Sequence, residues 1–177
     1  VLFGDYNPAG RLPITFYKSV DQLPDFQDYS MKGRTYRYMT QTPLYPFGHG
    51  LGYSPVRYAG LELSSERLAS DGVLQVGFSV HNAGAHAVEE VVQLYLRDDI
   101  AGTTRPLKAL KRFARVALAP GETKPVRFTL GARDFALLDH DLRPVVEPGR
   151  FTRYVGGSSA TELEAHFTIE GEGNRAI

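Results

Sequence analysis

The most constraining feature of this chain is a repeated alternation of apolar and polar residues over its last two-thirds. Leu74, Val76, Phe78 and Val80 alternate with polar or small residues, and the same period recurs over 92–97, 126–130 and 163–169. A period of two is typical of strands with one buried face. Turn signals separate the segments, at 82–84, 119–122, 147–149 and 156–157. The pattern predicts a mainly β fold of about seven strands, an antiparallel two-sheet β-sandwich.

Composition sets outer limits on function. The 177 residues allow one domain, or one domain with a sizeable appendage. Lysine plus arginine balances aspartate plus glutamate, 20 against 20, so no strong field attracts nucleic acid or a membrane surface, and neither is expected as a partner. The chain has no cysteine, which excludes disulfides and thiolate metal sites and leaves the compartment open. Its opening, Val-Leu-Phe-Gly, suggests a cut through a longer polypeptide.

Residues 1–55 differ from the rest and are predicted to form an irregular N-terminal arm. Prolines and glycines are too frequent there for a long helix. Leu12, Ile14 and Phe16 suggest one short strand, which Pro13 restricts to an edge. Six of the ten tyrosines lie between Phe26 and Tyr58. Such aromatic density favours burial against a neighbouring domain, so we expect an arm over 1–55 and a sandwich over 56–177.

The segment 106–116 has two interpretations. Basic residues at helical spacing, Lys108, Lys111, Arg112 and Arg115, suggest an amphipathic helix that could bind a membrane surface or an acidic partner. The alternative, which we favour, is a loop that runs into a strand, with Phe113 and Val116 pointing inward and the basic side chains protecting a sheet edge.

No catalytic or metal constellation is visible. The five histidines lack metal-ligand spacing, and Gly48–Gly52 is not preceded by a suitable strand or followed by a helix, as a nucleotide loop requires. Glu89 and Glu90 should point to opposite faces of a strand, and Asp98 and Asp99 should lie at a strand end. None of these carboxylates is expected to have apolar surroundings that raise its pKa. We therefore predict no catalytic, cofactor-binding or metal-binding residue and no cofactor.

Residues 7–13, 29–38 and 43–53 resemble the end of the second domain of the family 3 glycoside hydrolases, which include β-glucosidases and β-xylosidases. The 29–38 segment leans towards the xylosidase branch. Residues 90–97, 105–106, 110–111, 119–122 and 147–159 resemble the family's fibronectin type III-like domain, an immunoglobulin-like sandwich.

The resemblance implies a parent enzyme that is a retaining, exo-acting β-glycosidase. Its aspartate nucleophile and glutamate acid/base would lie upstream, so the chain alone is expected to be inactive. It implies a structural role, with the upstream catalytic domains of the same polypeptide as partners. One departure is Arg153, where the family usually has an apolar residue; it should reach the sandwich edge, pair with an acid or mark a distorted strand.

A second hypothesis is a carbohydrate-binding accessory module for a β-linked polysaccharide or oligosaccharide. Sugar rings stack on aromatic faces, and Tyr95 and the arm supply candidates. The residues expected to contact either carbohydrate or a neighbouring domain are Arg34, Tyr36, Arg37, Tyr38, Tyr45 and Tyr53. A third hypothesis is an unrelated interaction domain on the same fold.

Overall fold

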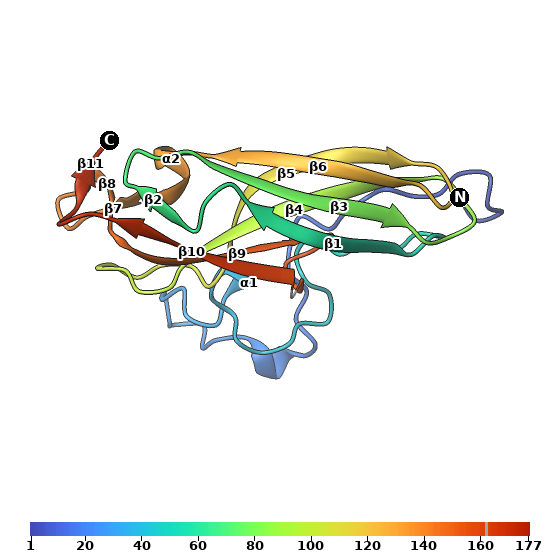
Figure 1. The fold of residues 1–177 in the computed structure, drawn as a ribbon. Helices are drawn as coiled ribbons and strands as arrows, with labels where there is room; N and C mark the ends of the chain where they lie inside the picture. The colour runs from blue at the N-terminus through green and yellow to red at the C-terminus, as the bar shows by residue number, and fades with distance from the viewer. Residues whose placement is uncertain (162) are drawn as a thin grey trace.

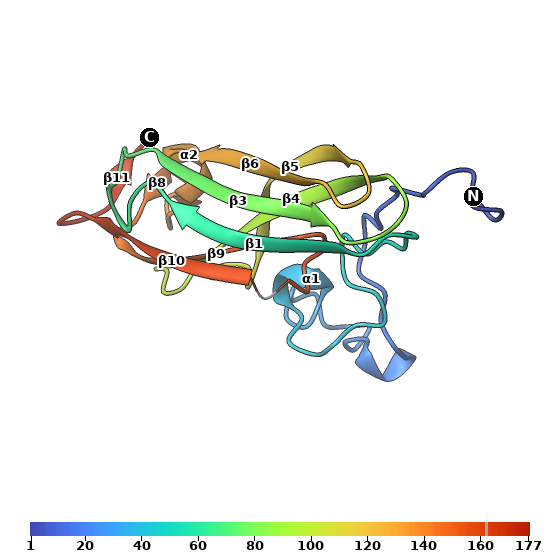
Figure 2. The same cartoon turned by 45° about the vertical axis from the view of Figure 1, so that its right-hand side comes forward.

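The computed structural model describes residues 1–161 and 163–177 and has two main layers of antiparallel strands (Figures 1 and 2). One sheet has the order β1-β3-β6, formed by Val56–Leu63, Leu74–Asn82 and Thr123–Leu130. The other has the order β2-β10-β9-β4-β5, formed by Arg67–Ala69, Leu163–Glu170, Gly149–Gly156, Val88–Asp98 and Ala109–Leu118. Only β2 pairs in parallel with its neighbour among these described strands. The predicted β-sandwich is confirmed.

A small third sheet closes the end of the sandwich that carries the C-terminus (Figure 1). Its order is β11-β8-β7, formed by Arg175–Ala176, Pro144–Val146 and Leu137–Leu138. The short helix α2, Ala132–Phe135, lies beside it. The N-terminus lies at the opposite end of the molecule in both views (Figures 1 and 2). No helix in the described part of the chain is long and apolar enough to cross a membrane.

The core lies between the two main sheets. Leu74, Val76, Phe78 and Val80 of β3 are all buried, as their alternation predicts. From the other sheet they meet the inward residues of β4, β9 and β10, namely Val92, Leu94, Leu96, Phe151, Val155, Phe167 and Ile169. Burying side chains of this size contributes roughly 1.5–3 kcal/mol each, which makes this cluster the main source of stability.

The segment 106–116 is a loop followed by strand β5, so the amphipathic helix does not form. The inward direction assigned to Phe113 is wrong, because its side chain is 67% exposed. Phe113 pairs with Gln93 of β4, whose side chain is on the outer face, and cross-strand partners share a face. Val116 pairs with Glu90 and packs against the core.

The arm runs along the outside of the sandwich with little regular structure (Figure 2). It contains the 3-10 turn η1, Val20–Gln22, and one helical turn, α1, Thr35–Tyr38. The short strand expected around Leu12–Phe16 is wrong: only an isolated bridge between Phe16 and Tyr45 forms. The segment instead shares backbone hydrogen bonds with the loop 44–49, and no adjoining strand extends the ladder.

Arg153 follows none of the three alternatives expected for it. Strand β9 is regular there, since Arg153 pairs with Ala165 on one side and Leu96 on the other. Its side chain is only 1% exposed, and its Nε and Nη1 atoms have no hydrogen-bond partner among the described residues. Burial lowers the pKa of the guanidinium to about 10, against the opposing influence of the Glu66 carboxylate. The core of the sandwich therefore contains a cation.

Candidate functional site: the joint between the arm and the sandwich

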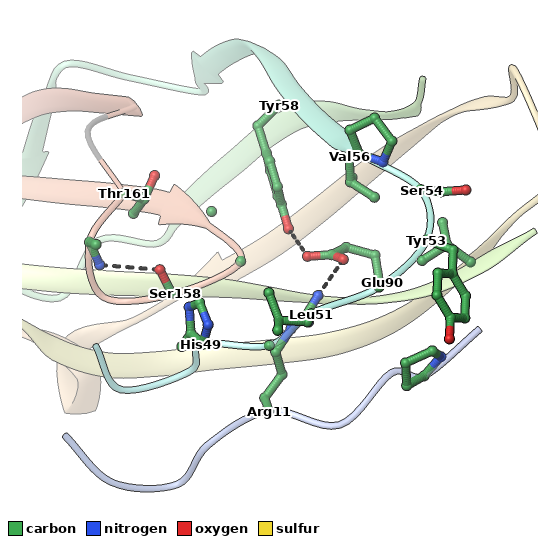
Figure 3. Close-up of a pocket in the computed structure, with 18 residues that line it drawn as sticks. Arg11, His49, Leu51, Tyr53, Ser54, Val56, Tyr58, Glu90, Ser158 and Thr161 are labelled. Atoms are coloured by element: carbon green, nitrogen blue, oxygen red, sulfur yellow. Dashed lines mark hydrogen bonds and ion pairs between the residues drawn. The ribbon is translucent and has the colours of Figure 1, made fainter. Parts of the chain in front are cut away.

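A buried ion pair connects the arm to both sheets (Figure 3). Arg11 Nη2 donates to Glu90 Oε2 at 2.5 Å, and the Tyr58 hydroxyl donates to Glu90 Oε1 at 2.6 Å. The Glu90 side chain is 4% exposed because it lies on the inward phase of β4, at the end of the strand. Burial and the Glu90 carboxylate raise the pKa of Tyr58 far above its ordinary value, so its hydroxyl remains a donor. Sequence reasoning missed this cluster, because Arg11 and Glu90 are 79 residues apart.

An aromatic cluster forms a second attachment, on the outer face of β4. The Tyr36 ring stacks on Phe47 at 4.5 Å between centroids and meets Tyr95 edge-on at 5.8 Å. Tyr95 is completely buried although it lies on the outward phase of its strand. Burial raises the pKa of its hydroxyl well above the ordinary value. The arm thus converts the outer face of a two-layer sandwich into a second, smaller core.

Polar contacts secure the backbone around these clusters. Leu107 N donates to Arg37 O at 2.7 Å, and Ser159 N donates to Phe47 O at 2.9 Å. Gly48 approaches the buried side chain of Gln93 so closely that a Cβ atom there would lie 2.7 Å from Nε2. Its φ of +81° also favours glycine, so glycine at position 48 is required by space and by conformation.

A cavity of about 580 Å³ opens at this joint. Figure 3 shows Arg11 and Tyr58 directed at Glu90 from opposite sides, with His49 beside Ser158 and Tyr53 at the other end of the cavity. The lining also includes Gly50, Gly52, Gly156 and Gly157.

The residues predicted for carbohydrate or interdomain contact do not gather at one place. Tyr36 is partly buried in the joint, while Tyr45 stacks on His49 at 4.9 Å and Tyr53 lines the cavity. Arg34 donates from Nε to Ser30 O at 2.8 Å and so stabilises the arm itself. Of the other two predicted residues, Tyr38 is partly buried in α1 and Arg37 is exposed. Tyr95 offers no exposed face for stacking.

One expectation about the carboxylates is wrong. Burial, followed by repulsion from Glu147, raises the pKa of Asp98 to about 6. Both of its carboxylate oxygens are buried, and Arg105 and the backbone of Ile100 only partly oppose this shift. The strand end carries this carboxylate inward against Phe151 and Phe135 rather than into a solvated turn. No group of three or more potential ligands that could hold a metal occurs in residues 1–161 and 163–177.

Comparison with known protein families assigns the two parts separately. Residues 1–53 match the glycosyl hydrolase family 3 C-terminal domain, and residues 90–159 match the fibronectin type III-like domain. The chain belongs to the C-terminal region of the family 3 glycoside hydrolases. The resemblance deduced from its motifs is confirmed.

Relatives of this family 3 C-terminal region carry glycosidase names. A β-xylosidase from Formosa agariphila is 44% identical over 92% of this chain, which covers 23% of that protein. A periplasmic β-glucosidase from Salmonella typhimurium is 36% identical over 96% of this chain and 24% of its own length. The chain thus spans about a quarter of the curated relatives it matches.

Solved structures agree with the fold of this family 3 C-terminal region. A β-glucosidase from Erythrobacter marinus superposes with a TM-score of 0.84 at 41% identity, over 96% of this chain and 23% of that one. A β-glucosidase from Listeria innocua gives a TM-score of 0.81 at 33% identity, over 96% of this chain and 26% of its own.

Proposed function

We propose that this chain is the non-catalytic brace of a retaining, exo-acting β-glucosidase or β-xylosidase. In this proposal residues 1–55 close the upstream domain and residues 56–177 form the bracing sandwich. The upstream catalytic domains of the same polypeptide are the partners. The names of the relatives support this assignment.

The observation that carries the proposal is the two-sided character of the arm. One side is attached to the sandwich through Arg11, Tyr36 and Phe47. The other side exposes large apolar side chains, of which Phe26 is 93% and Tyr29 is 91% exposed. Exposed apolar surface that is continuous with an attached segment marks an interaction site. The arm therefore has the properties of a segment that is attached to the sandwich on one side and contacts another domain on the other side.

A chimera tests this role. The corresponding C-terminal region of the Formosa agariphila β-xylosidase would be replaced by this chain, and hydrolysis of an aryl β-xyloside would be measured. We expect the chimera to be active and this chain alone to give no turnover above the blank with aryl β-xylosides or β-glucosides. Turnover by the isolated chain would contradict the non-catalytic assignment.

The joint is tested in the same chimera by changing the exposed side of the arm. Phe26→Ser with Tyr29→Ser should shorten the half-life of activity at elevated temperature, because the apolar contact with the upstream domain is lost. Arg57→Ser, at an exposed position of β1, serves as the control and should leave the half-life unchanged. Equal half-lives for all three chimeras would show that the arm does not contact the catalytic domains.

The carbohydrate-binding alternative has less support at the tyrosines named for it. Tyr36 and Tyr95 face each other inside the joint, and Tyr45 is stacked on His49. A sugar platform requires a ring with a free face. Tyr95 is fully buried and Tyr36 is covered by Phe47, whereas Tyr45 and Tyr53 remain 42% and 45% exposed.

A further inference from the structure

A cluster of four cations lies where the arm meets the start of β5. Arg105 and Lys111 line the same small void, and Arg112 follows Lys111 in the strand. The arm adds Arg37, whose backbone oxygen accepts a hydrogen bond from Leu107 N at 2.7 Å. The charges of all three arginines act on the ammonium group of Lys111. In a chain whose formal charges sum to zero, this is a local excess of positive charge.

One carboxylate acts on Lys111, and it is already engaged by an arginine. Asp134 Oδ1 accepts from Arg112 Nη1 and Asp134 Oδ2 accepts from Arg112 Nη2, both at 2.6 Å. Asp134 Oδ2 also accepts from Gly131 N at 2.9 Å. Asp134 therefore neutralises Arg112, and the other three cations of the cluster form no ion pair with any carboxylate among the described residues.

Asp98 reduces the excess of positive charge without removing it. Its carboxylate attracts Arg105 and lines the same small void. Four cations against the two carboxylates, Asp98 and Asp134, still leave two positive charges. Burial lowers the pKa of Lys111, Asp134 opposes this effect, and the guanidinium groups of the cluster lower the pKa further.

The three unpaired cations are accessible from solvent. Arg37 is exposed, and Arg105 and Lys111 are only partly buried. None of their nitrogen atoms is buried without a partner among the described residues, in contrast to Nε and Nη1 of Arg153. Lys111 Nζ makes no hydrogen bond within the described part of the chain, and Arg105 Nη2 makes only a long one, 3.5 Å, to Ala136 O. Their donors are therefore available to a ligand.

Two guanidinium groups and one ammonium group together match an oxyanion. A guanidinium presents its N–H donors in a planar fork that fits the oxygens of a carboxylate or phosphate group. An ammonium group supplies a compact charge and three further donors. Because two positive charges are in excess, a dianion gains more attraction than a monoanion does.

We propose that Arg37, Arg105 and Lys111 form a binding site for a phosphate group, either as inorganic phosphate or carried on a small sugar. The phosphate oxygens would accept from Arg37 of the arm and from Arg105 and Lys111 of the sandwich. The ligand would thus link the two parts of the chain. This site is separate from the cavity beside Arg11 and Glu90, and it does not depend on the identity of the parent enzyme.

The test is an amide-resolved NMR titration of the ¹⁵N-labelled chain at pH 7.5 with sodium phosphate and with D-glucose 6-phosphate. Sodium chloride at matched ionic strength is the control. We expect saturable shifts at Arg37, Leu107 and Lys111 with phosphate and none with chloride. Tighter binding of D-glucose 6-phosphate would assign the site to a sugar phosphate, and equal binding to the phosphate group alone. Shifts that do not saturate, or that chloride reproduces, would overturn the proposal.

A matched pair of variants assigns the binding to the cluster. Arg37→Gln removes an exposed cation of the arm, so the fold should persist and the Kd for phosphate should rise at least about tenfold. Arg115→Gln removes the same charge from β5, but Arg115 pairs with Glu89 and is not among the charges that act on Lys111. This control should leave the Kd unchanged, and equal Kd values for the two variants would refute the site.

The ammonium group of Lys111 gives a second measurement on the unmodified chain. A bound dianion favours the charged form of lysine, so saturating phosphate should raise the pKa of Lys111. The ¹³Cε shift of Lys111, followed over a pH titration with and without phosphate, reports this change. An unchanged titration midpoint would show that phosphate does not bind beside Lys111.

Discussion

Arg153 places a guanidinium between Phe151 and Val155, in the inward row of β9. A buried cation loses its hydration, and two of its donors gain no partner among the described residues in exchange. Replacing a buried charge by an apolar side chain of similar volume is often stabilising. Strand β9 is regular at this position, so the long, flexible side chain of methionine can occupy the space that the Arg153 side chain fills.

Arg153→Met should therefore raise the free energy of unfolding by about 1–3 kcal/mol. The measurement is urea unfolding at pH 7, followed by circular dichroism. Arg150→Met provides the control, because Arg150 is exposed and makes only a 3.5 Å ion pair with Asp99. A destabilised Arg153→Met variant would mean that the guanidinium is satisfied in solution.

Asp98 makes stability depend on pH. Its pKa is raised from 3.8 to about 6 by burial and by Glu147, against the attraction of Arg105. Lys111 and Asp134 also line the small void beside it, and Asp99 adds further repulsion. A raised carboxyl pKa means that the folded state takes up a proton before the unfolded state does. The penalty is therefore fully present above pH 6 and disappears as the pH falls towards 4.

Asp98→Asn should stabilise the chain at pH 7.5 by about 1–2 kcal/mol, after discounting for partial solvent exposure. At pH 4.5 the difference from the unmodified chain should be much smaller. Thermal unfolding at several pH values measures both. Asp141→Asn, at an exposed turn position, should show no such pH-dependent difference. A constant gain from Asp98→Asn at all pH values would contradict the protonation argument.

At the scale of elements, the outer face of β4 depends on the arm. Tyr36 contributes its ring to Phe47 and Tyr95, and its hydroxyl accepts from Leu110 N at 3.3 Å. Without the arm, the side chains of Tyr95 and Gln93 on the outer face of β4 would be exposed to solvent. The arm and the sandwich should consequently unfold together rather than as independent units.

Tyr36→Ala should cost about 2 kcal/mol of stability, less than a fully buried aromatic because Tyr36 is only partly buried. Tyr29→Ala is the matched control, since Tyr29 is 91% exposed, and should change stability by less than about 0.5 kcal/mol. Urea unfolding of both variants provides the values. Equal effects would show that the ring cluster does not hold the arm in solution.

For the whole molecule, the surface of the arm predicts how the isolated chain behaves. Phe3 and Phe26 are each 93% exposed, and Leu2 is 90% exposed. We expect the chain to bind a hydrophobic dye such as ANS more strongly than a closed sandwich of equal size does. Phe26→Ser with Tyr29→Ser should lower this fluorescence at unchanged thermal stability. Dye binding unaffected by the double variant would place the exposed apolar surface elsewhere.

The sequence alone determined the sandwich and the family. Alternation of period two is local, because neighbouring residues on a strand point to opposite faces, so the inward row of β3 could be predicted without any tertiary contact. The motifs at 7–13, 43–53 and 147–159 likewise depend only on order and spacing.

Only the tertiary structure decided which polar residues are buried. Arg11 meets Glu90 across 79 residues, and Gly48 covers Gln93, because the arm folds back over β4. The polar atoms of Asp98 and Arg153 are buried because each residue occupies a position of its strand that faces the core, although its side chain is charged. Phe113 is exposed because its partner Gln93 fixes the face. Pairing register and long-range contact set these outcomes, and neither is contained in the local periodicity.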